Sequence, residues 1–67
     1  MPKHPSVEHV LQFFTYEHLP EHLQKISKPF CELANTLAEE LEGPELTICL
    51  RKMLEAKDCA VRAALSA

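Results

Sequence analysis

The feature that most constrains the fold is the tripeptide Glu42-Gly43-Pro44, which separates two long stretches with helical periodicity. Gly43 is the only glycine in the chain, and glycine readily adopts the positive φ that ends many helices. Pro44 predicts the start of a new helix, because proline fits the first helical turn. Two long helices joined by so short a turn must run antiparallel. The sequence therefore predicts a helical hairpin.

The stretch after this turn, from Pro44 to Leu65, reads as one helix with a broad apolar arc. At about 100° per residue, the arc contains Leu46, Leu50, Met53, Leu54, Ala56, Ala60, Val61, Ala64 and Leu65. Lys57 falls near the middle of the arc. Burying an ammonium group without an anion is costly, so Lys57 either reaches solvent at an edge or meets negative charge.

The stretch before the turn, from Pro20 to Glu42, carries a heptad-like stripe, with Pro20 in the first turn. The stripe consists of Leu23, Ile26, Phe30, Leu33, Leu37 and Leu41. Pro29 removes one helical hydrogen bond, which predicts a kink near Lys25 to Pro29. Such a kink could open a crevice beside the stripe; alternatively, the polar residues there line the wet edge of an amphipathic helix. These residues are Gln24, Lys28, Cys31 and Asn35.

A third, short helix is predicted near the start of the chain. Residues 1–5 are expected to be extended or flexible because of their two prolines. Ser6, or His4 ahead of Pro5, is expected to cap the helix. Its apolar side contains Val7, Val10, Leu11, Phe13 and Phe14. The expected fold is thus a single all-α domain over residues 1–67, with the short helix packed on the hairpin.

A chain of 67 residues has a marginal core and usually needs a disulfide, a metal or oligomerisation. Three cysteines without a C-x-x-C pair argue against a disulfide framework and favour a reducing cytosol. His18 and His22 have chelating spacing, but no third or fourth ligand is evident, so no metal is predicted. The surplus apolar surface therefore favours burial between copies of the chain.

Charge and motifs exclude several classes of function. A net charge of −3 argues against binding a nucleic acid polymer, although a few focused cations could hold a small anion. The single glycine excludes glycine-rich phosphate loops, and no nucleophile and base pair is evident. The chain also has no apolar run long enough to span a membrane. We expect neither enzymatic activity nor a cofactor.

Two polar features leave alternatives open. Charges of alternating sign follow one side of the last predicted helix, at Arg51, Glu55, Asp58 and Arg62. They could form a solvent-exposed face or a contact between subunits. Tyr16, near His18, could stack on a nucleobase with a nearby lysine pairing a phosphate. A tyrosine between two helices is also often a residue at the rim of the core.

Three segments carry a family resemblance: YEHLPEHLQ, SKPF and LRKMLEAKDCAVRA. Over residues 4–65 the chain resembles the phage family of helical-hairpin cyclic-nucleotide sponges, the anti-CBASS and anti-Thoeris hairpin domain. The resemblance implies a short helix on a long antiparallel pair, assembled into a ring, commonly a hexamer. It also implies, in the cytoplasm of the infected host, binding without cleavage of cyclic di- and trinucleotides or related cyclic ADP-ribose molecules.

The resemblance further implies a ligand pocket between protomers. Tyr16 matches the family's stacking tyrosine, and Lys28 matches its phosphate-binding lysine, with Lys25 as the alternative. His18 and Gln24, which lie close to these positions in the sequence, are also expected to contact the ligand. In a ring, Lys57, Arg51 and Arg62 could each reach a shared ligand or a neighbour's Glu55 or Asp58. For Lys57 we favour an inter-subunit carboxylate over a ligand phosphate or a solvent-exposed stem.

Overall fold

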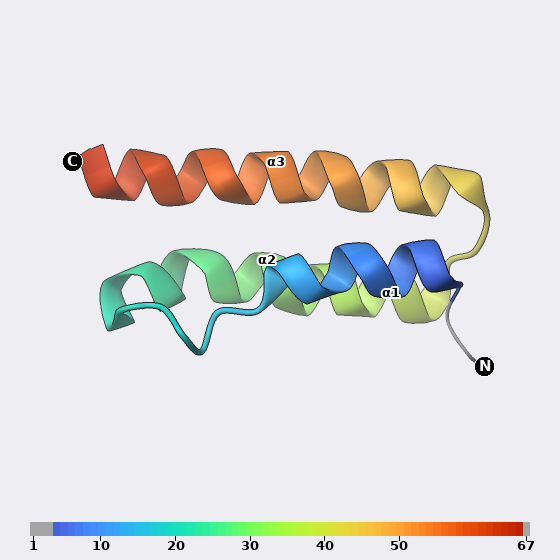
Figure 1. Ribbon diagram of the computed structural model, residues 1–67, viewed down its shortest axis with the longest axis horizontal. Coiled ribbons are helices and arrows are strands. Elements are labelled where there is room, and N and C mark those ends of the chain that lie inside the picture. Colours follow the sequence, from blue (N-terminus) through green and yellow to red (C-terminus); the bar gives the residue numbers. More distant parts are fainter. Residues whose placement is uncertain (1–3, 67) are drawn as a thin grey trace.

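The computed structural model describes residues 4–66, and these residues form an all-α fold, as predicted. The elements are α1 (Pro5–Leu11), the 3-10 helix η1 (Gln12–Phe14), α2 (Glu21–Glu40) and α3 (Pro44–Ser66). Helices α2 and α3 lie side by side and are joined by the turn at Gly43 (Figure 1). Helix α1 packs against both of them. The molecule is a rod that measures 38 × 19 × 16 Å.

Helix α1 begins at Pro5, one residue after its cap. The His4 Nδ1 atom accepts a hydrogen bond from the Ser6 amide at 3.1 Å, so His4 is the capping residue. Of the residues expected to be extended or flexible at the start of the chain, His4 is extended, whereas Pro5 already belongs to α1; residues 1–3 lie outside the described range. The Ser6 hydroxyl also lies 3.1 Å from the Thr47 hydroxyl, which links α1 to α3.

Helix α2 begins one residue later than the sequence suggests. Pro20 is the N-cap and not part of the first turn, because its ψ of 150° is extended while its carbonyl accepts the first helical hydrogen bonds. The helix then runs to Glu40 with Pro29 inside it. Gly43 has a φ of 99°, a region that glycine readily adopts, and α3 starts at Pro44 as expected.

The main core lies where α1, η1 and the Gly43 end of the α2–α3 pair meet. It contains the buried residues Val7, Val10, Phe14, Ala34, Ala38, Leu46 and Leu50. Small side chains on α2 therefore face this core. Ser27 is also fully buried, and its hydroxyl has no hydrogen-bond partner within the described residues.

The heptad-like stripe predicted on α2 is only partly buried: Leu23 is buried, and Phe30 and Leu37 pack against the core. Leu33 is 52% exposed and Leu41 is 49% exposed, whereas Ala34 and Ala38 lie in the core. The small alanines allow α2 to pack closely on its neighbours, and two of the larger leucines of the stripe, Leu33 and Leu41, are left about half exposed. Phe13 likewise points outward and stacks edge-on against His9, with ring centroids 5.4 Å apart. The rod therefore presents several large apolar side chains to solvent.

Candidate functional site

The loop between η1 and α2 forms one wall of a cleft. A turn closes this loop, with the Leu19 amide donating to the Tyr16 carbonyl at 3.0 Å. The Gln24 side-chain amide holds the loop from α2, donating to the carbonyls of Leu19 at 2.8 Å and Glu17 at 3.3 Å. Gln24 thus positions the loop, a role that sequence reasoning did not assign to it.

The other wall of the cleft comes from the second half of α3. The cleft has a volume of about 200 Å³ and brings together His18, Lys57 and Arg62, three of the residues predicted to bind a ligand. The remaining lining residues are Phe13, Thr15, Leu19, Asp58 and Val61. Two cations and an imidazole therefore share a hollow with a single carboxylate.

Lys57 is the most enclosed charged group of this cleft. Its side chain is only 13% exposed, as its place in the apolar arc predicts, and its ammonium nitrogen lies 2.9 Å from the carboxylate of Asp58. The anion that compensates Lys57 is thus its own sequence neighbour, a pairing that helical spacing does not suggest. Asp58 is about half exposed, so the ion pair lies at the wall of the cleft and is open on one side.

Arg62 has no carboxylate partner within the described residues. Its guanidinium donates to the sulfur of Cys59 at 3.4 Å. Lys52, and not Arg51 or Arg62, pairs with Glu55, at 3.9 Å. The charged residues predicted on α3 therefore do not form a continuous series of ion pairs within one chain. The Arg62 guanidinium remains available to an anion outside the chain.

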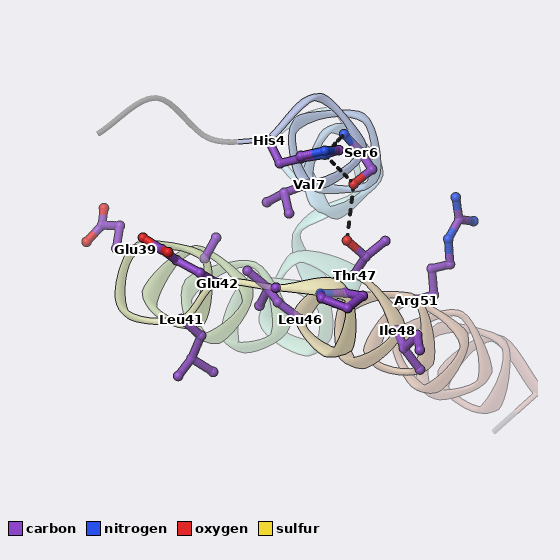
Figure 2. Close-up of a pocket in the computed structure, with 13 residues that line it drawn as sticks. His4, Ser6, Val7, Glu39, Leu41, Glu42, Leu46, Thr47, Ile48 and Arg51 are labelled. Carbon is purple, nitrogen blue, oxygen red and sulfur yellow. Dashed lines mark hydrogen bonds between the residues drawn. The ribbon is translucent and has the colours of Figure 1, made fainter.

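Tyr16, Lys28 and Lys25 do not line the cleft. Tyr16 is half-buried on the loop beside it, while both lysines are exposed on α2. The polar residues predicted beside the Pro29 kink line neither this cleft nor the groove near the Gly43 turn. Among them, the Asn35 amide donates back to the Cys31 carbonyl at 2.8 Å. Arg51 lies nearer the start of α3, in a different groove near the Gly43 turn (Figure 2).

The three cysteines within residues 4–66 are free thiols. Burial raises the pKa of the Cys31 thiol above 9.0, and the nearby carboxylates of Glu17 and Glu32 raise it further, although the Asn35 hydrogen bond opposes them. A thiol with a raised pKa is mostly protonated at neutral pH and is a poor nucleophile. Across the same residues, no three histidine, cysteine or acidic side chains gather in a way that could hold a metal ion.

Comparisons of the chain with family models, curated proteins and solved structures found no match. No helix within residues 4–66 has both the length and the apolar character needed to cross a membrane.

Proposed function

We propose that this chain is a phage-type sponge that binds cyclic oligonucleotide second messengers without cleaving them. Its ligands would be cyclic dinucleotides and also cyclic trinucleotides. Acting in the host cytoplasm, it would lower the concentration of free messenger below the threshold of a CBASS-like defence effector. The working form would be a ring of helical hairpins, a homohexamer in the first instance.

The observation that carries this proposal is where the three distinctive sequence segments lie. YEHLPEHLQ forms the loop and the first turn of α2, SKPF follows in α2, and LRKMLEAKDCAVRA forms most of α3. The first and third of these segments supply most of the lining of the cleft, including His18, Lys57 and Arg62. Residues that resemble a nucleotide-binding family thus surround a hollow that can bind an anion.

The size of the cleft favours a ligand held between copies. A volume of about 200 Å³ is smaller than the roughly 300–1,000 Å³ of typical small-molecule pockets. One copy can therefore enclose a phosphate, but a second copy must cover the rest of a cyclic dinucleotide. Tyr16, half-buried beside the cleft, is placed to offer its ring to a base at such a junction.

The chemistry around the cleft supports binding over cleavage. Lys57 and Arg62 can pair with phosphates, and Lys57 is already held by Asp58. Phosphodiester hydrolysis would need an activated water or nucleophile, and no described residue forms a nucleophile and base pair here. Inhibition by depletion would then require the protein in amounts stoichiometric with the messenger, because each assembly binds a fixed number of molecules and does not turn them over.

The direct test is to mix the protein with a panel of cyclic di- and trinucleotides, remove the unbound ligand, denature the complex with heat and analyse the supernatant. We expect intact nucleotide in stoichiometric amounts. Linear products would indicate an enzyme, and no recovered ligand from any member of the panel would contradict the proposal.

Variants can then locate the site. Tyr16→Ala and Lys57→Met are expected to reduce binding at least tenfold, while Tyr16→Phe, which keeps the ring, binds nearly normally. Lys52→Gln is the matched control, because Lys52 is a strongly exposed lysine of α3 outside the cleft. Comparing Lys28→Gln with Lys25→Gln tests which lysine of α2 reaches the phosphate.

The alternative function is a structural oligomer with no small ligand. The exposed Leu33, Leu41 and Leu65 favour this reading, because they are suited to contacts between proteins. It predicts an assembly of the same size that shows no thermal shift with any nucleotide. In that case Tyr16→Ala would weaken the fold and have no binding to abolish.

A further inference from the structure

An exposed aromatic ring lies at the wall of the cleft that contains Lys57 and Arg62. Phe13 lines this cleft, and its side chain is 49% exposed. The next residue, Phe14, is fully buried in the main core. The 3-10 helix η1 thus places one of two consecutive phenylalanine rings in the core and the other at the cleft. Packing within the chain accounts for Phe14 but does not account for Phe13.

Neighbouring side chains restrict the orientation of the Phe13 ring. The ring of His9, four residues earlier, meets it edge-on, with ring centroids 5.4 Å apart and an angle of 83° between the ring planes. The Gln12 side-chain amide in turn lies 3.1 Å from the His9 Nδ1 atom. An edge-on aromatic pair is attractive and so limits the rotation of both rings. A ring that is held in this way loses less entropy when a flat partner stacks on it.

The surroundings of Phe13 combine an aromatic surface with positive charge. Lys57 and Arg62 line the same hollow of about 200 Å³. Proteins that bind single-stranded nucleic acids use this combination, because the cations pair with phosphates and the aromatic rings stack on bases. An inorganic anion would leave the ring uncovered, and an uncharged apolar ligand would leave the cations without an anion. A ligand that fits the whole cleft therefore carries both a phosphate and a flat aromatic group.

We propose that Phe13 is a stacking platform for a nucleobase whose phosphate is held by Lys57 and Arg62. This inference rests on the proposed function and adds a base-binding residue to the same site. Tyr16, the stacking residue predicted from the sequence, is half-buried beside the cleft and does not line it, whereas Phe13 does. A cyclic dinucleotide has two bases, so the two rings would each stack on a different base.

A tryptophan at position 13 gives the proposed contact a spectroscopic signal. The chain contains no tryptophan, so Phe13→Trp introduces the only indole and keeps an aromatic ring at the cleft. We expect cyclic di-AMP, cyclic di-GMP or cyclic GMP-AMP to quench the fluorescence of this variant, with a midpoint near the dissociation constant of the wild type. Inorganic pyrophosphate, which has no base, should leave the fluorescence nearly unchanged.

Leu33 provides the matched control. It is a similarly exposed apolar residue, at 52%, and it lies outside both the cleft and the groove near the Gly43 turn. The fluorescence of Leu33→Trp should not respond to the nucleotides. In direct binding measurements, Phe13→Ala should weaken nucleotide binding at least about fivefold, the lower limit for losing one stacked base. Phe13→Tyr, which keeps the ring, and Leu33→Ala, which truncates the control residue, should bind like the wild type.

The outcomes separate this inference from the proposed function. A wild type that binds a nucleotide, with Phe13→Ala binding it equally well and Phe13→Trp not quenched, would overturn the role of Phe13 alone. A wild type that binds none of the nucleotides would overturn the proposed function and the role of Phe13 with it. Circular dichroism checks that the variants fold, and light scattering measures their mass. A changed mass for Phe13→Ala would assign the ring to a protein contact and overturn the stacking role.

Discussion

Lys57 shows how a single residue connects the fold of this protein to its proposed site. Its position in an apolar arc requires an anion or an exit to solvent, and the structure supplies Asp58 at 2.9 Å. An ion pair that is partly enclosed contributes little net stability, because removing both charges from water offsets much of their attraction. The presence of a lysine at this position is therefore better explained by binding of an anionic ligand than by a contribution to the stability of the fold.

This interpretation predicts that Lys57→Met leaves the free energy of unfolding within about 1 kcal/mol of the wild type, or raises it, while nucleotide binding is lost. Urea denaturation and a thermal-shift titration measure the two effects. Asp58→Asn is the informative comparison, because it leaves the enclosed ammonium without its partner and should cost about 1 kcal/mol or more. A loss above about 2 kcal/mol for Lys57→Met would instead make Lys57 a structural residue.

Cys31 provides a second prediction at this scale. Its pKa is raised in the folded chain, first by burial and then by Glu17 and Glu32, so the thiol stays protonated to higher pH than an ordinary thiol. The alkylation rate of Cys31 should therefore reach half of its maximum above pH 9.0, and closer to pH 9.0 when the chain is unfolded in urea. Peptide mass spectrometry across a pH series measures both midpoints, and equal midpoints would contradict the assigned environment.

At the scale of elements, side-chain size explains the principal error of the sequence-based prediction. The spacing of the leucines on α2 suggested one buried stripe, but Ala34 and Ala38 occupy the core and Leu33 and Leu41 do not. Periodicity locates an apolar arc without saying which part of it faces a neighbouring helix. Here α2 contacts α1, η1 and α3 together, and the small residues fit that crowded side.

The Gly43 turn gives a prediction for the connection between α2 and α3. An added Cβ at Gly43 would meet no atom within 4 Å, so space is not the limitation, but its φ of 99° is unfavourable for other residues. Gly43→Ala should therefore lower the free energy of unfolding by about 1–2 kcal/mol. Glu42→Ala, next to it, is the control and should change stability by less than about 0.5 kcal/mol. Urea denaturation checks both, and equal effects would contradict the backbone explanation.

At the scale of the whole molecule, the rod has two ends with different chemistry. The loop end carries the cleft with His18, Lys57 and Arg62, and the turn end carries the apolar groove with Glu39 and Glu42. A chain this small buries a limited core, and several of its large apolar residues stay exposed. Association of copies would cover those residues and would close the open side of the small cleft.

Association makes stability depend on concentration, because binding between folded chains stabilises them by mass action. The thermal midpoint should rise by several degrees over a roughly hundredfold increase in protein concentration. Leu65→Glu, which places a charge at the most exposed of the large apolar residues, should reduce this dependence while its midpoint remains near that of the dilute wild type. Differential scanning calorimetry at several concentrations measures the effect, and a constant wild-type midpoint would indicate a stable monomer.

The amino-acid sequence by itself determined the all-α class, the positions of the three main helices and the enclosed position of Lys57, because these follow from local preferences and from helical periodicity. Only the tertiary structure decided that Asp58 compensates Lys57, that Gln24 holds the loop, and that His18 meets Arg62 across a cleft. Those facts depend on which side of each helix faces its neighbours. That choice is made by the packing of side chains far apart in the chain, which no local pattern records.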